Sequence, residues 1–328
     1  MSPGDDPAVG VGDRPAVVAV GGRPAVVAVG GGHGQAATLR AARRYAGQLT
    51  AVVTVADDGG SSGRLRRQLG IVPPGDLRRC LAALAAEGSS LATAFEHRFG
   101  VDLLDPAEAL IGADPASRRD PTQPPVGHAL GNLVLAGLVA VLGDVQAALD
   151  EAGRLLGAVG RVVPAAAEPL ELKADAAAGV VHGQSAVRRT GHIRRVSLVP
   201  DDPPAPTAAL AALARADQVV LGPGSLYTSV LAAAVVPAVT DAIGRSPGTV
   251  VYVANLRPET AETEGYDVAD HVAALLDHGV RVDVVLADPS TIAVGPVPVP
   301  VVCWDLARPN GLAHDPGRLA AALAGLVG

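Results

Sequence analysis

Three glycine-rich segments each follow an apolar run that predicts a buried strand. They are residues 30–34, 58–63 and 222–225. Glycine lets the backbone approach a phosphate closely, and the N-terminus of a following helix presents unpaired N–H groups to an anion. Because the carboxyl ends of parallel strands meet at one edge of a sheet, we expect the three turns to converge on one ligand crevice. Taken alone, any one of them could equally be a plain strand-to-helix connection.

The side chains that could contact a phosphorylated ligand lie in and beside these turns. Hydroxyl groups add to the backbone donors, and the guanidinium fork of arginine matches phosphate oxygens. Of the arginines that crowd residues 64–79, we expect only one or two to reach a ligand. The candidates are Gly30, Gly31, Gly32, His33, Gly34, Asp57, Asp58, Gly59, Gly60, Ser61, Ser62, Arg64, Asp76, Arg79, Gly222, Pro223, Gly224, Ser225, Thr228 and Ser229.

Three aspartates near the second turn could bind Mg²⁺, because carboxylates together with substrate phosphates are the usual ligands of that ion. They are Asp57, Asp58 and Asp76, and we take Asp58 and Asp76 as the candidate metal ligands. Aspartate also caps helices and turns. For Asp76, at the start of a predicted helix, capping and ligand contact are equally plausible, whereas for Asp58 we favour function.

No residue can be assigned a catalytic role from the sequence. It has no Ser-His-Asp order, no nucleophile elbow and no P-loop lysine, and its only lysine is Lys173. His33 and His128 could titrate, but an isolated histidine more often packs as a hydrogen-bonding group. The first turn departs from the dinucleotide fingerprint, since Gln35 stands where the third glycine or alanine is expected, and this counts against a NAD-like ligand.

Composition sets the class of protein. The 328 residues are 49% hydrophobic but only 2% aromatic, so the core must be built from Ala, Val and Leu. A net charge of -7 gives no basic field for nucleic acid. The two cysteines, Cys80 and Cys303, form no disulfide framework or zinc motif. With no signal peptide and no apolar run long enough to span a bilayer, we expect a cytoplasmic protein without a membrane span.

Strand and helix patterns alternate over most of the chain and predict a Rossmann-like, doubly wound α/β domain with a mostly parallel sheet at residues 23–328. Among them are a strand at 218–221 and a helix at 268–277, and the Pro-, Asp- and Arg-rich residues 100–126 predict a long loop. Short apolar runs at 161–163, 170–172, 179–182 and 193–199 predict a small antiparallel β insertion at about 160–200. Residues 14–22 and 23–31 are exact copies, and only the second copy leads through a glycine turn into a helix. We therefore expect residues 1–22 to be a duplicated extension that is disordered or adds an edge strand.

Residues 49–86, which include DDGGSSGRLRRQLG at 57–70, are similar almost throughout to the signature of the YvcK-type gluconeogenesis factors, relatives of 2-phospho-L-lactate transferase. Further matches are residues 97–99, 127–133, 222–229, 255–256, 262–266 and 270–271. The chain departs from the family at His33 in GGGHG, and at residues 259–261, where Glu-Thr-Ala replaces the common Gln-Pro-Gly and adds a negative charge near the presumed ligand.

This resemblance implies the 2-phospho-L-lactate transferase-like fold and a ligand of the nucleotide-sugar or nucleoside diphosphate class, with Asn132 and Asn255 as further binding residues. UDP-sugars, UDP-N-acetylglucosamine above all, are associated with the family, as are cell shape and growth on gluconeogenic carbon sources. We expect a homo-oligomer, a dimer. Three functions stay open: a non-catalytic nucleotide-sugar sensor, a Mg²⁺-dependent transferase that acts on a nucleoside diphosphate donor, and, more weakly supported, a NAD-dependent oxidoreductase.

Overall fold

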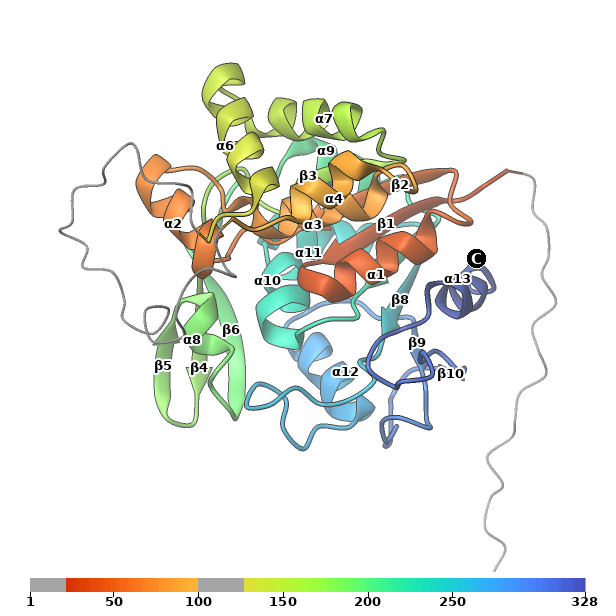
Figure 1. Ribbon diagram of the computed structural model, residues 1–328. Helices are drawn as coiled ribbons and strands as arrows, with labels where there is room; N and C mark the ends of the chain where they lie inside the picture. Colours follow the sequence, from red (N-terminus) through yellow and green to blue (C-terminus); the bar gives the residue numbers. More distant parts are fainter. Residues whose placement is uncertain (1–21, 100–126, 328) are drawn as a thin grey trace, which may run out of the picture.

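A central parallel sheet of seven strands organises the computed structural model, which describes residues 22–99 and 127–327 (Figure 1). The duplicated copy at 14–22 and the predicted loop at 100–126 lie almost wholly outside the described residues. The strand order is β10-β9-β8-β7-β1-β2-β3. The strands are β1 (Ala25–Gly30), β2 (Gln48–Val53), β3 (Arg161–Pro164), β7 (Gln218–Leu221), β8 (Thr249–Val253), β9 (Val284–Ala287) and β10 (Val301–Cys303).

The sheet reverses its direction of growth beside its central strand. From β1 the chain first adds β2 and β3 on one side, then returns to pair β7 with the other side of β1 and continues through β8, β9 and β10. Val26 of β1 pairs with Leu49 of β2 and with Gln218 of β7. In open α/β sheets this switch point, at the carboxyl ends of the strands, is where ligands bind.

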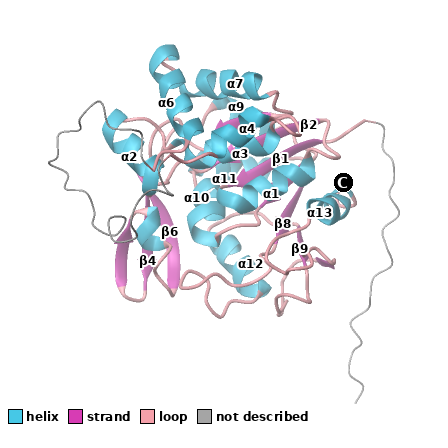
Figure 2. Cartoon of the chain, viewed as in Figure 1, coloured by secondary structure: helices cyan, strands magenta, loops and turns pink. Residues whose placement is uncertain are grey.

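Helices cover both faces of this sheet (Figure 2). Helix α1 packs on α3 and α13, whereas α9 packs on α11 behind the sheet as drawn in Figure 1. The helices are α1 (Gly32–Ala42), α2 (Gly60–Leu69), α3 (Pro74–Leu84), α4 (Ser90–Glu96), α6 (Leu130–Leu142), α7 (Val145–Leu156), α9 (Thr207–Leu213), the π-helix η2 (Leu226–Leu231), α10 (Ala232–Ala234), α11 (Pro237–Arg245), α12 (Val268–Asp277) and α13 (Pro316–Ala324).

Small side chains allow these close contacts. Ala36, Ala41 and Ala42 of α1 are buried, and the three alanines of α10 are completely inaccessible. Since aromatic residues are so few, the core depends on backbones that approach each other closely rather than on large side chains. Among the described residues no single helix is long and apolar enough to cross a membrane. Within this part of the chain, only the bent pair of helices at 226–234 and 237–245, taken together, has the length and apolar composition of such a span.

The antiparallel insertion is a three-stranded sheet of order β5-β4-β6 that carries one short helix. Its elements are β4 (Glu171–Ala176), β5 (Gly179–His182), α8 (Gln184–Val187) and β6 (Ile193–Val199). The prediction that residues 161–163 begin this insertion is wrong: β3 pairs in parallel with β2 and forms an edge of the main sheet. A short valine run looks the same in either sheet, because the pairing partner is not encoded locally.

Candidate ligand-binding site

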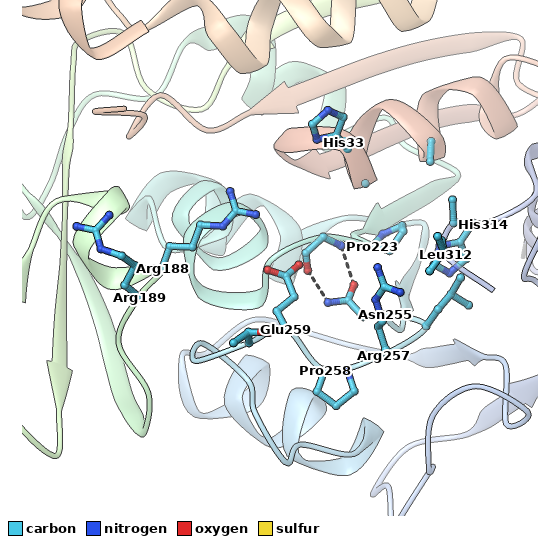
Figure 3. A pocket seen from close by; sticks show the side chains of 16 residues that line it. His33, Arg188, Arg189, Pro223, Asn255, Arg257, Pro258, Glu259, Leu312 and His314 are labelled. Carbon is cyan, nitrogen blue, oxygen red and sulfur yellow. Dashed lines mark hydrogen bonds between the residues drawn. The ribbon is translucent and has the colours of Figure 1, made fainter. Parts of the chain in front are cut away.

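A cavity of about 620 Å³ opens at the switch point, beyond the carboxyl ends of β1, β7 and β8 (Figure 3). Four separate regions of the main domain and one of the insertion form its walls. The lining residues are His33, Gly34, Ala37, Arg188, Arg189, Pro223, Gly224, Asn255, Leu256, Arg257, Pro258, Glu259, Thr260, Leu312, Ala313 and His314.

The charges around this cavity are mostly positive. Arg188, Arg189 and Arg257 line it, and within residues 22–99 and 127–327 none of these three guanidinium groups forms an ion pair. Figure 3 places Arg188 and Arg189 on one side and Arg257 with Asn255 on the other. Guanidinium groups that lack a carboxylate partner can pair with the oxygens of an anionic ligand. The cavity is therefore suited to a diphosphate.

Two histidines of the cavity are held neutral. Partial burial lowers the pKa of His33, and the positive charges of Arg79 and Arg188 lower it further. Deeper burial lowers the pKa of His314 to about 4, despite a hydrogen bond with the backbone of Ala254. The Nε2 atom of His314 is buried and has no partner among the described residues. Neither histidine adds charge to the site at neutral pH.

The third glycine turn is braced by two side chains that follow β8. Asn255 Oδ1 accepts a hydrogen bond from the Gly224 N–H at 2.8 Å, and Asn255 Nδ2 donates to the Gly224 carbonyl at 2.9 Å. The Ser225 hydroxyl donates to Glu259 at 2.6 Å. The Glu259 carboxylate therefore already accepts a hydrogen bond from the Ser225 hydroxyl of the protein itself. These contacts hold the turn rigid before a ligand binds.

Glu262 caps the helix that follows this turn. Its carboxylate accepts the N–H groups of Tyr227 at 2.7 Å and Thr228 at 3.0 Å, and the Thr228 hydroxyl at 2.9 Å. Burial raises the pKa of Glu262, although these donors favour its ionised form. From the sequence, such donors, including the Thr228 hydroxyl, were expected to bind a phosphate. In the structure a carboxylate of the chain already occupies them.

The first and third turns touch each other. A side chain on Gly34 would overlap the carbonyl oxygen of Pro223, and the Thr38 hydroxyl donates to the Gly222 carbonyl at 2.7 Å. Gly32 and Gly34 lie within α1, so this helix begins earlier than the sequence pattern indicated. Ser229 lies beside the same contact, where its Oγ would be 3.5 Å from a β-carbon built on Gly32. These two predicted turns do converge.

The second turn lies apart from the cavity lining. Asp57, which directly precedes this turn, accepts a hydrogen bond from the N–H of Gly59, and Asp58 contacts the insertion instead. In α2, Ser61 Oγ lies 3.0 Å from His128 Nδ1 and accepts from Asn132 Nδ2 at 2.9 Å. The hydrogen-bonded cluster is buried. The remaining candidates nearby, Gly60, Ser62 and Arg64, also lie outside the cavity lining.

Asp76 lies under the first turn rather than in the cavity. Arg79 Nη1 donates to its Oδ1 at 2.6 Å, and a β-carbon on Gly31 would come within 2.7 Å of its Oδ2. Burial raises the pKa of Asp76, and the nearby Asp57 raises it further, while Arg79 and the backbone of Gly32 lower it. In the part of the chain that the structure describes, no group of three or more His, Cys, Asp or Glu side chains could hold a metal ion.

Five of the predicted residues therefore line the cavity: His33, Gly34, Pro223, Gly224 and Asn255. Sequence reasoning missed Arg188, Arg189, Arg257, Leu312 and His314 as lining residues. The adjacent arginines at 188–189 were a visible signal, but they lie within the β insertion and only the tertiary structure brings them to the switch point. His314 belongs to the C-terminal region, which no predicted motif reached.

Comparison with known proteins agrees with this fold. The family model described as 2-phospho-L-lactate transferase CofD matches residues 26–296. Two proteins named gluconeogenesis factor are similar: one from Halalkalibacterium halodurans is 40% identical, covering 75% of this chain and 71% of that protein, and one from Bacillus subtilis is 38% identical, covering 75% and 72%. A Mycobacterium tuberculosis protein that carries this name provisionally is 43% identical over 90% of this chain and 88% of its own.

A solved structure extends the similarity to three dimensions. The crystal structure of a member of the UPF0052 family from Bacillus halodurans superimposes with a TM-score of 0.78 at 34% sequence identity. The match covers 91% of this chain and 97% of that one. The similarity therefore spans both the parallel sheet and the antiparallel insertion. The chain belongs to the 2-phospho-L-lactate transferase CofD family, in the branch of the YvcK-type gluconeogenesis factors.

Proposed function

We propose that this protein is a regulatory factor that binds a nucleotide sugar, UDP-N-acetylglucosamine, in the switch-point cavity and supports growth on gluconeogenic carbon sources. The observation that carries the proposal is a set of three arginines, Arg188, Arg189 and Arg257, that line a cavity of about 620 Å³ and form no ion pair within residues 22–99 and 127–327. A volume of this size suits a ligand of several hundred daltons. The arginines supply charge for a diphosphate, and the close-packed glycine turns leave room for it.

A sensor agrees better with the lining residues than an enzyme does. The ionisable groups that line the cavity, besides the arginines, are His33, Glu259 and His314. Glu259 accepts a hydrogen bond from Ser225, and both histidines are held neutral. Within the described ranges neither histidine is hydrogen-bonded to a hydroxyl or a thiol, and a histidine paired with such a nucleophile is a common arrangement for covalent catalysis. The relatives named gluconeogenesis factor support the physiological role.

Calorimetric titration tests the binding. We expect UDP-N-acetylglucosamine to bind the unmutated protein, and Arg188→Ala combined with Arg189→Ala to weaken it about tenfold or more while affecting uridine much less, because uridine carries no phosphate. Arg154→Ala is the matched control, since Arg154 is an exposed arginine that pairs with Glu151 on α7, away from the cavity. Equal affinity of the double variant and the parent for UDP-N-acetylglucosamine would contradict the proposal.

The physiological part is tested by complementation. A bacterial strain that lacks its own gluconeogenesis factor should grow on glycerol when it expresses this chain, and it should fail to do so with the variant at 188 and 189. Growth on glucose is the control, because it does not require gluconeogenesis. Full rescue by a variant that no longer binds the nucleotide sugar would separate growth from ligand binding.

A second candidate is a transferase, and the match to the 2-phospho-L-lactate transferase model favours it. Such an enzyme would move a phosphoryl-bearing group from a nucleoside diphosphate donor to an acceptor hydroxyl and release the nucleoside monophosphate. The test is incubation of the protein with a nucleoside diphosphate donor, an acceptor and Mg²⁺. Release of nucleoside monophosphate only when protein and acceptor are both present would favour this candidate over the sensor.

A further inference from the structure

The carboxylate of Asp58, in the main domain, contacts the antiparallel insertion beside the ligand cavity. Asp58 Oδ1 accepts hydrogen bonds from the Ser185 N–H at 2.9 Å and from the Ser185 hydroxyl at 2.5 Å. A side chain on Gly183 would overlap Asp58 Oδ2, so glycine is required there for the approach, and its φ of 90° also favours glycine. Both carboxylate oxygens of Asp58 therefore face the insertion.

A second contact fixes the same segment to the third turn. Gln184, the first residue of α8, donates from Nε2 to the Thr228 carbonyl at 2.6 Å. Helix α8 is thus held between the second glycine turn and the helix that follows the third. Arg188 and Arg189 come directly after α8 and line the cavity. Their position depends on where these two contacts hold the helix.

We propose that Asp58 is a positioning residue, whose carboxylate docks α8 of the insertion so that Arg188 and Arg189 reach the ligand cavity. The insertion then acts as the part of the molecule that supplies the cationic side of the site, and the second glycine turn acts as its anchor rather than as a phosphate cradle. The docking itself is independent of the ligand's identity. Its effect on affinity rests on the proposed function.

This role disagrees with a metal role for Asp58 and Asp76. Mg²⁺ demands near-octahedral oxygen ligands and binds through carboxylates that are open to it. Asp58 Oδ1 already accepts two donors, and Asp76 Oδ1 is paired with the Arg79 guanidinium at 2.6 Å. The donor set as folded does not fit a cation shared by Asp58 and Asp76.

Hydrogen exchange in the full-length protein without ligand tests the docking. The Ser185 amide donates to Asp58, and the amides of Ala186, Val187 and Arg188 donate within the turn that this contact holds. Asp58→Ala should raise exchange across residues 184–188 about tenfold, the scale of one charge-assisted hydrogen bond. Asp58→Asn keeps an acceptor oxygen and should stay close to the parent. Unchanged exchange in Asp58→Ala would overturn the docking.

A matched control shows whether the effect is local. Asp144→Ala removes a carboxylate that caps α7 by accepting a hydrogen bond from the Ala147 N–H at 2.7 Å. Like Asp58, Asp144 thus binds a backbone N–H at the start of a helix, but it lies away from the insertion. It should leave exchange at residues 184–188 unchanged. An equal rise there would mean that the response reports general destabilisation, and would overturn the assignment to Asp58.

Titration with UDP-N-acetylglucosamine tests the consequence. Asp58→Ala should weaken binding about tenfold, Asp58→Asn should stay within about threefold of the parent, and Asp58→Ala should add little to a variant that already carries Arg188→Ala and Arg189→Ala. A metal role predicts instead that Asn and Ala both abolish a Mg²⁺ dependence of binding, which would overturn the positioning role. Should the unmutated protein fail to bind, the proposed function falls, while the exchange experiment still decides the docking.

Discussion

Glu262 holds Thr228 twice, through the backbone N–H at 3.0 Å and through the side-chain hydroxyl at 2.9 Å. The carboxylate thus takes the place at a helix N-terminus that an anionic ligand occupies in many α/β proteins. Because Glu262 already accepts hydrogen bonds from these donors, the proposed diphosphate would have to pair with positive charge elsewhere. Arg188 and Arg189 of the insertion line the cavity and would supply that charge.

Replacing Glu262 should destabilise the protein according to how many acceptors remain. Glu262→Ala leaves three buried donors without a partner and should lower the free energy of unfolding by about 3 kcal/mol. Glu262→Gln keeps one acceptor oxygen and should cost about 1 kcal/mol. Urea denaturation at pH 7 measures both. Equal losses for the two variants would show that the lost volume, and not the hydrogen bonds, sets the cost.

Gly34→Ala should disrupt the packing between the first and third turns. A methyl group there would overlap the Pro223 carbonyl oxygen, and backbone atoms on both sides leave little freedom to relax, so we expect a loss of about 3 kcal/mol or failure to fold. Gly60→Ala is the control: Gly60 has a positive φ of 45° but nothing within 4 Å, and should cost only about 1 kcal/mol. Thermal melting compares the two, and similar midpoints would refute the steric argument.

Acidification should destabilise the fold through His314. Its pKa is lowered to about 4 in the folded protein by burial, whereas the unfolded chain binds the proton near the usual 6.5. Stability from the neutral ring is therefore fully present above pH 6.5 and is lost as pH falls toward 4, by about 3 kcal/mol in total.

The comparison that isolates this group uses His314→Gln. Burial also lowers the pKa of His271 and His278, so the parent carries several such contributions in the same pH window. Urea unfolding at pH 7.5 and 4.5 should show a smaller pH dependence in the variant than in the parent. The same pH dependence of the free energy of unfolding in both proteins would contradict the prediction, because it would mean that His314 has the same pKa in the folded and the unfolded protein.

Ala261 is a site where a substitution should stabilise the protein. Its φ of 65° lies in the left-handed region, which costs an alanine about 1 kcal/mol, and the family pattern has glycine at this position. We expect Ala261→Gly to raise the free energy of unfolding by up to about 1 kcal/mol. Ala273→Gly, at an exposed position inside α12, should lower it by about 1 kcal/mol. Changes of the same sign at the two sites would argue against backbone strain at Ala261.

Much of the fold could be predicted from local pattern. The runs at 218–221 and 268–277 match β7 and α12, and the insertion strands at 179–182 and 193–199 match β5 and β6. Helices α7, α11 and α13 were not predicted, although each has a buried and an exposed face, as in α7, where Ala148, Leu149, Ala152 and Leu156 are buried. Residues 161–163 were placed in the wrong sheet for lack of any local sign of their partner.

The site was harder to predict than the fold. Glycine turns mark the ends of strands in the sequence, which is why Gly34, Pro223 and Gly224 were found. The cationic wall comes from the insertion, and residues 188–189 reach the cavity only because Asp58 and Gln184 dock their helix. Contacts of this kind join residues that are 127 and 44 positions apart. No local sequence pattern predicts contacts between residues so far apart in the chain.

The long return from β1 to β7 also governs how the protein is made. Ala25 and Asp217 exchange hydrogen bonds across 192 residues, and β1 has no second neighbour in the sheet until β7 arrives. At the usual rate of synthesis, about 5–20 residues per second, the ribosome needs roughly 10–40 s to supply that strand. During this time a nascent chain carries an open, valine-rich edge that can pair with a neighbouring chain. Binding of a chaperone to this edge during translation is therefore expected to raise the yield of folded protein.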